Sequence, residues 1–121
     1  RQNASDWRIE NKRWILTELM GTPVEIPKEG KEAWIKMDME TGTAIGNNGC
    51  NSFIIQYDLL RGNRISFSKG ASTLMACPDM EINDAFMEAL GKTDNYSLGE
   101  DGTLTFYKAK MAPLAHLKVA K

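Results

Sequence analysis

The chain has little net charge, no long apolar run and few of the side chains that carry chemistry. Its 121 residues include one histidine and two cysteines, and its 15 basic residues nearly balance its 16 acidic ones. No apolar run approaches the roughly 20 residues that a membrane-spanning helix needs. A formal net charge of −1 argues against a broad electrostatic grip on nucleic acid or on an acidic membrane. We therefore expect no transmembrane segment in these residues and no nucleic-acid partner.

The scarcity of histidine and cysteine also bears on catalysis. A thiol enzyme would use Cys50 or Cys77 as nucleophile and His116 as base, but His116 lies in an alternating strand pattern, where packed or surface histidines are far commoner. Two cysteines and one histidine at these spacings match no short-spaced zinc ligand pair. The acidic residues between 79 and 84 lack the alternating oxygen ligands of an EF-hand. We predict no catalytic residue, no metal site and no cofactor.

What is present is the composition of one globular domain, with 42% hydrophobic and 26% charged residues. Residues 1–12 are polar apart from Trp7 and Ile9, and we predict a polar leader or tether there. One domain is expected over residues 13–121. The chain opens on Arg1 without a methionine or a secretory apolar region, so we expect a trimmed mature domain whose signal or lipid-anchor segment lies upstream of these residues.

Strand patterns recur along the chain. Alternation is clear over residues 33–39, which places Met37 and Met39 on one face, and again over residues 52–59. Residues 46–51 are rich in glycine and asparagine and indicate an irregular corner outside any strand. Further short strands are predicted at residues 14–19, 43–45, 64–67, 71–75, 96–98, 103–107 and 114–119.

One segment has helical periodicity. Pro78 suits the first helical position, and acidic residues follow it in the first turns. An apolar stripe over residues 82–90 repeats at helical spacing, and Gly91 is the expected end. The whole pattern predicts a mainly β (α+β) fold: about eight short antiparallel strands in a barrel or half-barrel, closed by one α-helix near residues 79–90.

A set of motif residues is typical of a known protein family. These residues are Gly49, Cys50, Asn51, Phe53, Tyr57, Thr73, Met75, Ala76, Cys77 and Glu81. Few other domains combine Gly-Cys-Asn with Met-Ala-Cys at this separation, and the chain resembles the META domain family (HslJ-like) over roughly residues 13–119. The family often has glycine where this chain has Ile55, and isoleucine disfavours the bulge or bend that glycine permits there.

The resemblance implies a compact β-rich domain, usually exported and often lipid-anchored in the bacterial periplasm or outer membrane. It implies an association with heat shock, other stress or drug resistance, and no established enzymatic activity. The family pattern also implies that Cys50 and Cys77 lie close together. Whether they form a disulfide or remain two buried thiols depends on the compartment. We expect a monomeric, non-enzymatic binding or interaction module whose partner the sequence does not name.

Two other functions remain open at this point. Methionines could line the barrel and hold a small apolar ligand, although ordinary core filling is the commoner role; these are Met37, Met39, Met75, Met80 and Met87. A thiol-based redox enzyme is the weakest of the three hypotheses. It requires an accessible cysteine with His116 near it.

Overall fold

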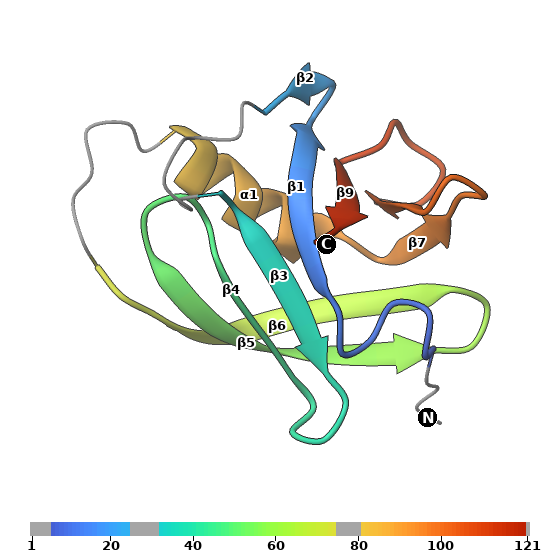
Figure 1. Cartoon of the computed structure of the whole chain (residues 1–121), viewed down its shortest axis with the longest axis horizontal. Coiled ribbons are helices and arrows are strands. Elements are labelled where there is room, and N and C mark those ends of the chain that lie inside the picture. The colour runs from blue at the N-terminus through green and yellow to red at the C-terminus, as the bar shows by residue number, and fades with distance from the viewer. Residues whose placement is uncertain (1–5, 25–31, 75–80, 121) are drawn as a thin grey trace.

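The structure is a computed structural model that describes residues 6–24, 32–74 and 81–120. A twisted barrel of antiparallel strands surrounds the core, and a single described helix lies at one end of it (Figure 1). The elements are β1 (Arg13–Leu19), β2 (Thr22–Pro23), β3 (Trp34–Asp38), β4 (Thr43–Asn47), β5 (Ser52–Leu60), β6 (Arg64–Ser72), α1 (Glu81–Lys92), β7 (Asn95–Leu98), β8 (Thr103–Tyr107) and β9 (Ala115–Val119).

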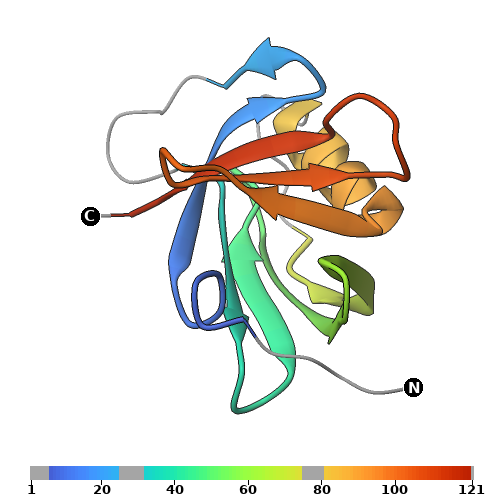
Figure 2. The ribbon, with the colours of Figure 1, turned by 90° about the vertical axis from the view of Figure 1, so that its right-hand side faces the viewer.

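The sheet closes on itself. Strands β1 and β3 to β9 pair in sequence order, and β9 then pairs with β1 from Trp14 opposite Val119 to Leu19 opposite Ala115. The two-residue strand β2 pairs only with the end of β1. The predicted antiparallel barrel with one helix is confirmed, and it is a closed barrel of eight strands (Figure 2).

One joint of the barrel is much shorter than the others. Strands β6 and β7 share a single residue pair, Arg64 opposite Asn95. Two backbone bonds support this joint, from Ile65 N to Asp94 O (3.3 Å) and from Tyr96 N to Asn63 O (2.9 Å). Beyond it the two strands diverge, and α1 packs against β6 and β1.

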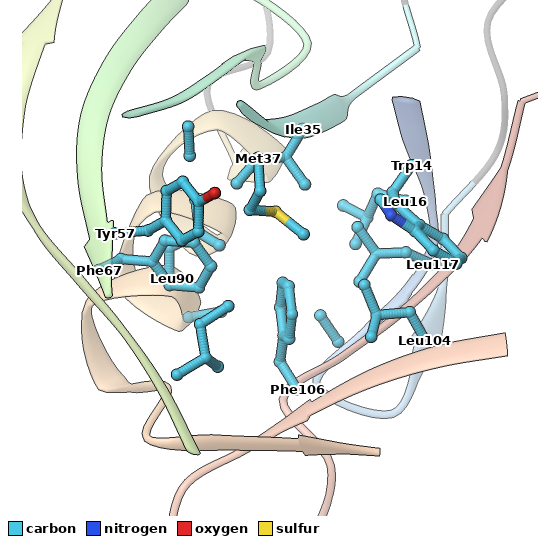
Figure 3. Close-up of a cluster of buried hydrophobic side chains, with 14 of the residues drawn as sticks. Trp14, Leu16, Ile35, Met37, Tyr57, Phe67, Leu90, Leu104, Phe106 and Leu117 are labelled. Atoms are coloured by element: carbon cyan, nitrogen blue, oxygen red, sulfur yellow. The ribbon is translucent and has the colours of Figure 1, made fainter. Parts of the chain in front are cut away.

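The interior is filled by the protein's own side chains. Inward positions of the strands meet the apolar stripe of α1, and Figure 3 shows part of this cluster. Phe53 packs edge to face on Phe86, with ring centres 6.1 Å apart, and Phe67 packs in the same way on Phe106 at 5.4 Å. All four rings are buried. Burial of so much apolar surface is the main stabilising contribution to the domain.

Several sequence-based expectations about individual elements need correction. Strand β4 continues through Gly46 and Asn47, so the irregular corner is shorter than expected and lies at residues 48–51. Gly46 tolerates this because it lies against β3, where an added Cβ would be 2.2 Å from Trp34 O. Residues 64–72 form one strand instead of two. Helix α1 passes Gly91 and ends at Lys92.

A further correction concerns Met39. It was expected to face inward with Met37, but it lies in the turn after β3 and is 50% exposed, whereas Met37 is fully buried. Strand alternation therefore ends one residue earlier than the pattern suggested. The expectations for Met75, Pro78, Asp79 and Met80 fall outside the described residues.

A bulge occurs where Ile55 was expected to prevent one. Ile54 pairs with Ala71 and Gln56 pairs with Ser68, so Ile55 alone faces two residues of β6. The glycine that permits the irregularity is Gly70 on the partner strand, where an added Cβ would come within 2.0 Å of Ile54 O. In this chain the bulge is accommodated by a glycine on β6 and does not need one at position 55 of β5.

Residues 6–12, within the segment predicted as a polar leader, lie against the end of the barrel that is opposite α1 (Figures 1 and 2). Ile9 is fully buried, and its carbonyl accepts a hydrogen bond from Trp14 Nε1 (2.8 Å). Asn11 N donates to Met37 O (2.7 Å), and Asn11 Oδ1 accepts from Met39 N (2.9 Å). We call residues 6–12 the docked segment.

Candidate functional site

The corner of residues 48–51 joins β4 to β5 and carries the Gly-Cys-Asn motif. The Asn48 side chain is almost wholly buried and accepts hydrogen bonds from the backbone N–H of Cys50 (3.3 Å) and Asn51 (2.8 Å). Asn48 N donates to Asn51 O (3.0 Å), which closes the turn. Gly49 has φ +95°, a conformation that L side chains rarely adopt. Asn48 was not among the predicted site residues, although it fixes the motif's shape.

Asn51 links three elements at the α1 end. Its Nδ2 donates to Asn83 Oδ1 in α1 (3.2 Å), and its Oδ1 accepts from Thr73 Oγ1 (2.8 Å) at the end of β6. Thr73 Oγ1 in turn accepts from Ser52 N (3.2 Å). Because Asn51 and Asn83 are buried, these bonds offset the cost of removing amide groups from water. The motif asparagine therefore acts as a structural clamp, which we call the amide clamp.

Cys50 lies beside this clamp. It is buried, and Asn51 Nδ2 lies 3.5 Å from its Sγ. No cysteine among the described residues is a free thiol. Met75, Ala76 and Cys77 lie outside the described residues, so the pairing of Cys50 with Cys77 stays a prediction.

The remaining motif residues point in different directions. Phe53 is part of the core, and Tyr57 points inward from the far half of β5 (Figure 3). Glu81 is exposed at the first position of α1, where a carboxylate complements the helix dipole. The structure therefore brings Gly49, Cys50 and Asn51 together with Thr73, and it places Tyr57 at the other end of the barrel.

At that end, two acids of the docked segment bind two core tyrosines. Glu10 is 5% exposed, and its Oε2 accepts a hydrogen bond from the Tyr57 hydroxyl. Glu10 Oε1 accepts from Asp6 N (2.8 Å), and Asp6 Oδ2 accepts from the Tyr96 hydroxyl (2.9 Å). Asp6 also pairs with Arg8 (2.9 Å). We call Asp6, Glu10, Tyr57 and Tyr96 the acid–tyrosine network.

The network shifts the acid–base behaviour of its members. Burial raises the pKa of Tyr57 far above its usual range, and the hydrogen bond to Glu10 adds to this. Burial and the bond to Asp6 raise the pKa of Tyr96 in the same way. The hydrogen bond from Arg8 lowers the pKa of Asp6. Both tyrosines are therefore neutral donors at neutral pH, a role that suits anchoring of the docked segment.

His116 forms a polar row on the outside of the barrel. Its Nδ1 lies 2.9 Å from Thr105 Oγ1, and its Nε2 lies 3.1 Å from Glu18 Oε2. The row follows from register, since Thr105 and Glu18 each lie opposite His116 on the neighbouring strands. The order of hydroxyl, imidazole and carboxylate resembles an acyl-transfer site. However, Thr105 is only 5% exposed in the middle of β8, which leaves its hydroxyl no access to a substrate.

Two grooves open on the surface of the barrel, and the second of them reaches core side chains. One groove, with a volume of about 510 Å³, lies between the β1–β2 turn and the loop from β8 to β9. A second, of about 580 Å³, lies between β6 and α1 and is lined in part by Phe67, Gly70, Met87 and Leu90. Met87 is therefore partly at a surface groove, while Met37 belongs to the filled core.

In residues 6–24, 32–74 and 81–120, no group of three or more histidine, cysteine, aspartate or glutamate side chains is placed to hold a metal ion. In the same ranges, no helix is long and apolar enough to cross a membrane.

A comparison with known families identifies the fold. The model of the META domain matches residues 7–121, nearly the whole chain. The chain belongs to the META domain family. Within this META domain, the match includes most of the docked segment as well as the barrel.

Two solved structures share the fold of this META domain. One is an NMR structure of a protein from Burkholderia xenovorans, with 21% identity, a TM-score of 0.71, and alignment over 100% of this chain and 94% of that one. A second NMR structure has the same identity and TM-score and aligns over 96% of this chain and 95% of its own. No curated protein matches the chain.

Proposed function

We propose that this META domain is a non-enzymatic binding module that engages its partner through the outer surface of the barrel. One observation carries the proposal: the core side chains occupy the interior, while the polar motif side chains bind one another. Among the described residues of these two regions, the polar side chains face one another and not an open cavity. The groove beside the β1–β2 turn and the groove between β6 and α1 both open on the surface, where a partner can reach them.

The same arrangement supports a non-enzymatic role, because neither Cys50 nor His116 is placed for catalysis. Cys50 is buried in the corner, and the imidazole nitrogens of His116 bind Thr105 and Glu18. A reactive cysteine needs an accessible thiolate with a base or cation near it. Hydrolytic or thiol-dependent turnover that disappears in Cys50→Ala would overturn this part of the proposal.

The carrier hypothesis loses its main support. It needed space enclosed within the barrel, but the ring pairs Phe53–Phe86 and Phe67–Phe106 fill that part of the interior, and the groove that reaches Phe67 opens on the surface between β6 and α1. Met39, one of the methionines proposed to line such a cavity, points to solvent from a turn. A ligand of this domain is more readily accommodated in a groove on the outside.

The proposal extends to the cell envelope and to stress. Family membership supports an exported protein in the periplasm or on the outer membrane, where it would assist survival under heat or drug stress. Fractionation of the host, with this protein detected in the envelope or in the cytoplasm, tests the location. Loss of heat or drug tolerance in a deletion strain, restored by the wild-type gene, tests the role.

A native, non-reducing mass spectrum of the protein purified from its host tests binding directly. Mass in excess of the polypeptide that is lost on denaturation identifies a retained ligand or partner. A polypeptide of bare mass that also forms no cross-links through photoreactive residues placed in either groove contradicts the binding proposal. The denatured, unreduced mass also tests the disulfide, because a Cys50–Cys77 bridge removes two hydrogens.

A further inference from the structure

The groove beside Met20 is built from three separate parts of the chain. The β1–β2 turn, the C-terminal end of α1 and the loop from β8 to β9 form its walls, and Met20 N donates to Leu114 O (2.8 Å) between two of them. Its volume of about 510 Å³ lies within the roughly 300–1,000 Å³ typical of small-molecule sites. We call it the Met20 groove.

Apolar side chains dominate the surface of this groove. Met20 is 42% exposed and Met111 is 65% exposed, and Pro113 and Leu114 lie between them in the lining. Single exposed apolar side chains are common on protein surfaces, but several of them gathered at one groove often mark a binding site. Methionine is flexible and polarizable, so two methionines can adapt to an alkyl chain of variable conformation.

The backbone holds Met20 at the groove in an unfavourable conformation. Met20 has φ +49° and Gly21 has φ +84°, as the tight β1–β2 turn requires. Asparagine or glycine occupies the first of these positions at a lower energetic cost than methionine. Strained residues of this kind cluster at functional sites. Here the strained position carries a thioether, whereas a residue that favours this turn would carry a small polar group or none.

The opposite wall has a second strained residue. Ala109 has φ +51° in the loop that supplies Lys108 and Met111. Asp94 Oδ1 accepts a hydrogen bond from Ala109 N (2.8 Å), and Asn95 Nδ2 donates to Ala109 O (3.0 Å). These two bonds fix the start of the loop against β7, so this wall of the groove is preformed.

Two lysines supply positive charge at the groove. Lys92 and Lys108 both line it, and the one lining carboxylate, Glu18, is bound to His116 at 3.1 Å. Lys92 has only a long, exposed contact with Glu88 (3.6 Å), and such pairs contribute little. Among the described residues, Lys108 has no carboxylate within ion-pair distance. An anionic group at this edge would therefore meet two available ammonium groups.

We infer that the Met20 groove binds a single-chain amphiphile of the fatty-acid class. The alkyl chain lies on Met20, Met111 and Leu114, and the carboxylate lies between Lys92 and Lys108. This inference rests on the proposed binding function and names its ligand class. It differs from an internal carrier because the ligand lies outside the strands.

The first test titrates dodecanoate, below its micellar concentration, into the whole purified chain and measures binding by calorimetry and NMR shifts. We expect saturable binding with shifts at Met20, Met111 and Leu114. The Lys92→Gln/Lys108→Gln variant should bind about tenfold or more weakly, because it loses two charge-assisted contacts. Lys110→Gln is the matched control: it removes a lysine of the same loop that does not line the groove, and it should bind like wild type.

A second variant separates binding from folding. Met20→Asn replaces the strained methionine by a residue that favours positive φ, so its melting temperature should rise. The same change removes part of the apolar lining, and we expect binding of dodecanoate to fall several-fold. A loss of affinity in a more stable protein cannot come from misfolding.

Specific outcomes overturn the inference. They are the absence of dodecanoate binding, equal binding of dodecyltrimethylammonium, and equal loss of affinity in Lys110→Gln and the double variant. Binding that occurs only to vesicles of anionic phospholipid also overturns it, in favour of a membrane surface. If a partner still co-purifies in the native mass spectrum in any of these cases, the proposed binding function stands without this ligand.

Discussion

The two ends of the barrel are closed by different chemistry. At the α1 end, the amide clamp of Asn51, Asn83 and Thr73 consists of neutral groups. At the other end, the acid–tyrosine network joins carboxylates of the docked segment to the hydroxyls of Tyr57 and Tyr96. Both sets satisfy buried polar groups, but only one of them contains groups that titrate.

Because of this difference, the stability of the domain should depend on pH mainly through the end that carries the docked segment. A neutral amide set contributes equally at all pH values at which the protein is folded. The lowered pKa of Asp6 gives a contribution that is present above about pH 4 and lost as the pH falls through that pKa. The raised pKa values of Tyr57 and Tyr96 make the free energy of unfolding fall as the pH rises above about 10.

The largest expected effect is at the α1 end. Phe86→Ala removes a fully buried ring that packs on Phe53, and it should lower the free energy of unfolding by about 3–5 kcal/mol. Denaturant unfolding measures this loss. Phe86→Leu serves as the control and should lose much less, because it keeps most of the buried volume. An equal, small loss in both variants would show that α1 does not close the core.

Next in size is Tyr57→Phe, which removes the hydroxyl that binds buried Glu10 and should cost about 1.5–3 kcal/mol near neutral pH. In wild type, folded Tyr57 keeps its proton above about pH 10, where the unfolded chain loses it, so unfolding is favoured as the pH rises, by about 1.4 kcal/mol per pH unit.

Tyr57→Phe lacks this linkage. Its stability should therefore decline less steeply than that of wild type above about pH 10. The measurement is urea unfolding at a series of alkaline pH values. Tyr107→Phe is the control for loss of a tyrosine hydroxyl, because Tyr107 lies outside the acid–tyrosine network and accepts a 3.3 Å bond from Ser97. Identical slopes in wild type and Tyr57→Phe would remove the proposed contrast between the two ends.

The amide clamp should give a smaller and flat response. Asn51→Ala removes the bonds of Asn51 to Asn83 Oδ1 and Thr73 Oγ1 and should cost about 1–3 kcal/mol. Because no member of the clamp titrates, the difference from wild type should be constant from about pH 5 to pH 9. Unfolding at three pH values checks this. A difference that changes steadily with pH would mean that an ionised group takes part at this end.

The smallest effect is expected on the outside of the docked segment. Trp7 is mostly exposed, and Lys12 Nζ lies 5.5 Å from its ring, so Trp7→Ala should change stability by about 0.5 kcal/mol or less. Ile9→Ala, two residues away, should cost about 2–5 kcal/mol because Ile9 is fully buried. Thermal unfolding of both variants measures the contrast. Similar losses would show that the segment is not held through Ile9.

Much of the barrel could be predicted because strand alternation repeats at a period of two. The pattern over residues 52–59 assigned the inward side chains of β5, and the apolar stripe over residues 82–90 assigned the buried face of α1. Errors arose where the deciding contact is distant in sequence. Gly46 looked like a turn glycine, yet it is needed because β3 approaches it closely.

The candidate sites were harder to predict for the same reason. Trp7 and Ile9 are the two large apolar residues of an otherwise polar segment, and two residues are too few to define a period. Glu10 could have been a surface carboxylate, and only its position beside Tyr57 makes it part of a network. One local signal could have indicated the outer groove. Met20 occupies the first position of a tight turn before Gly21, where asparagine, aspartate or glycine is usual.

The pairing of β1 with β9 has a kinetic consequence. It joins Trp14 to Val119, residues about 100 positions apart, and this ladder completes the ring of strands. Contacts of such high sequence separation form late and slow the search for the native state, so refolding should take milliseconds to seconds. Until that ladder forms, β1 and β9 each present an open edge to other chains, and the time before closure is when aggregation competes with folding.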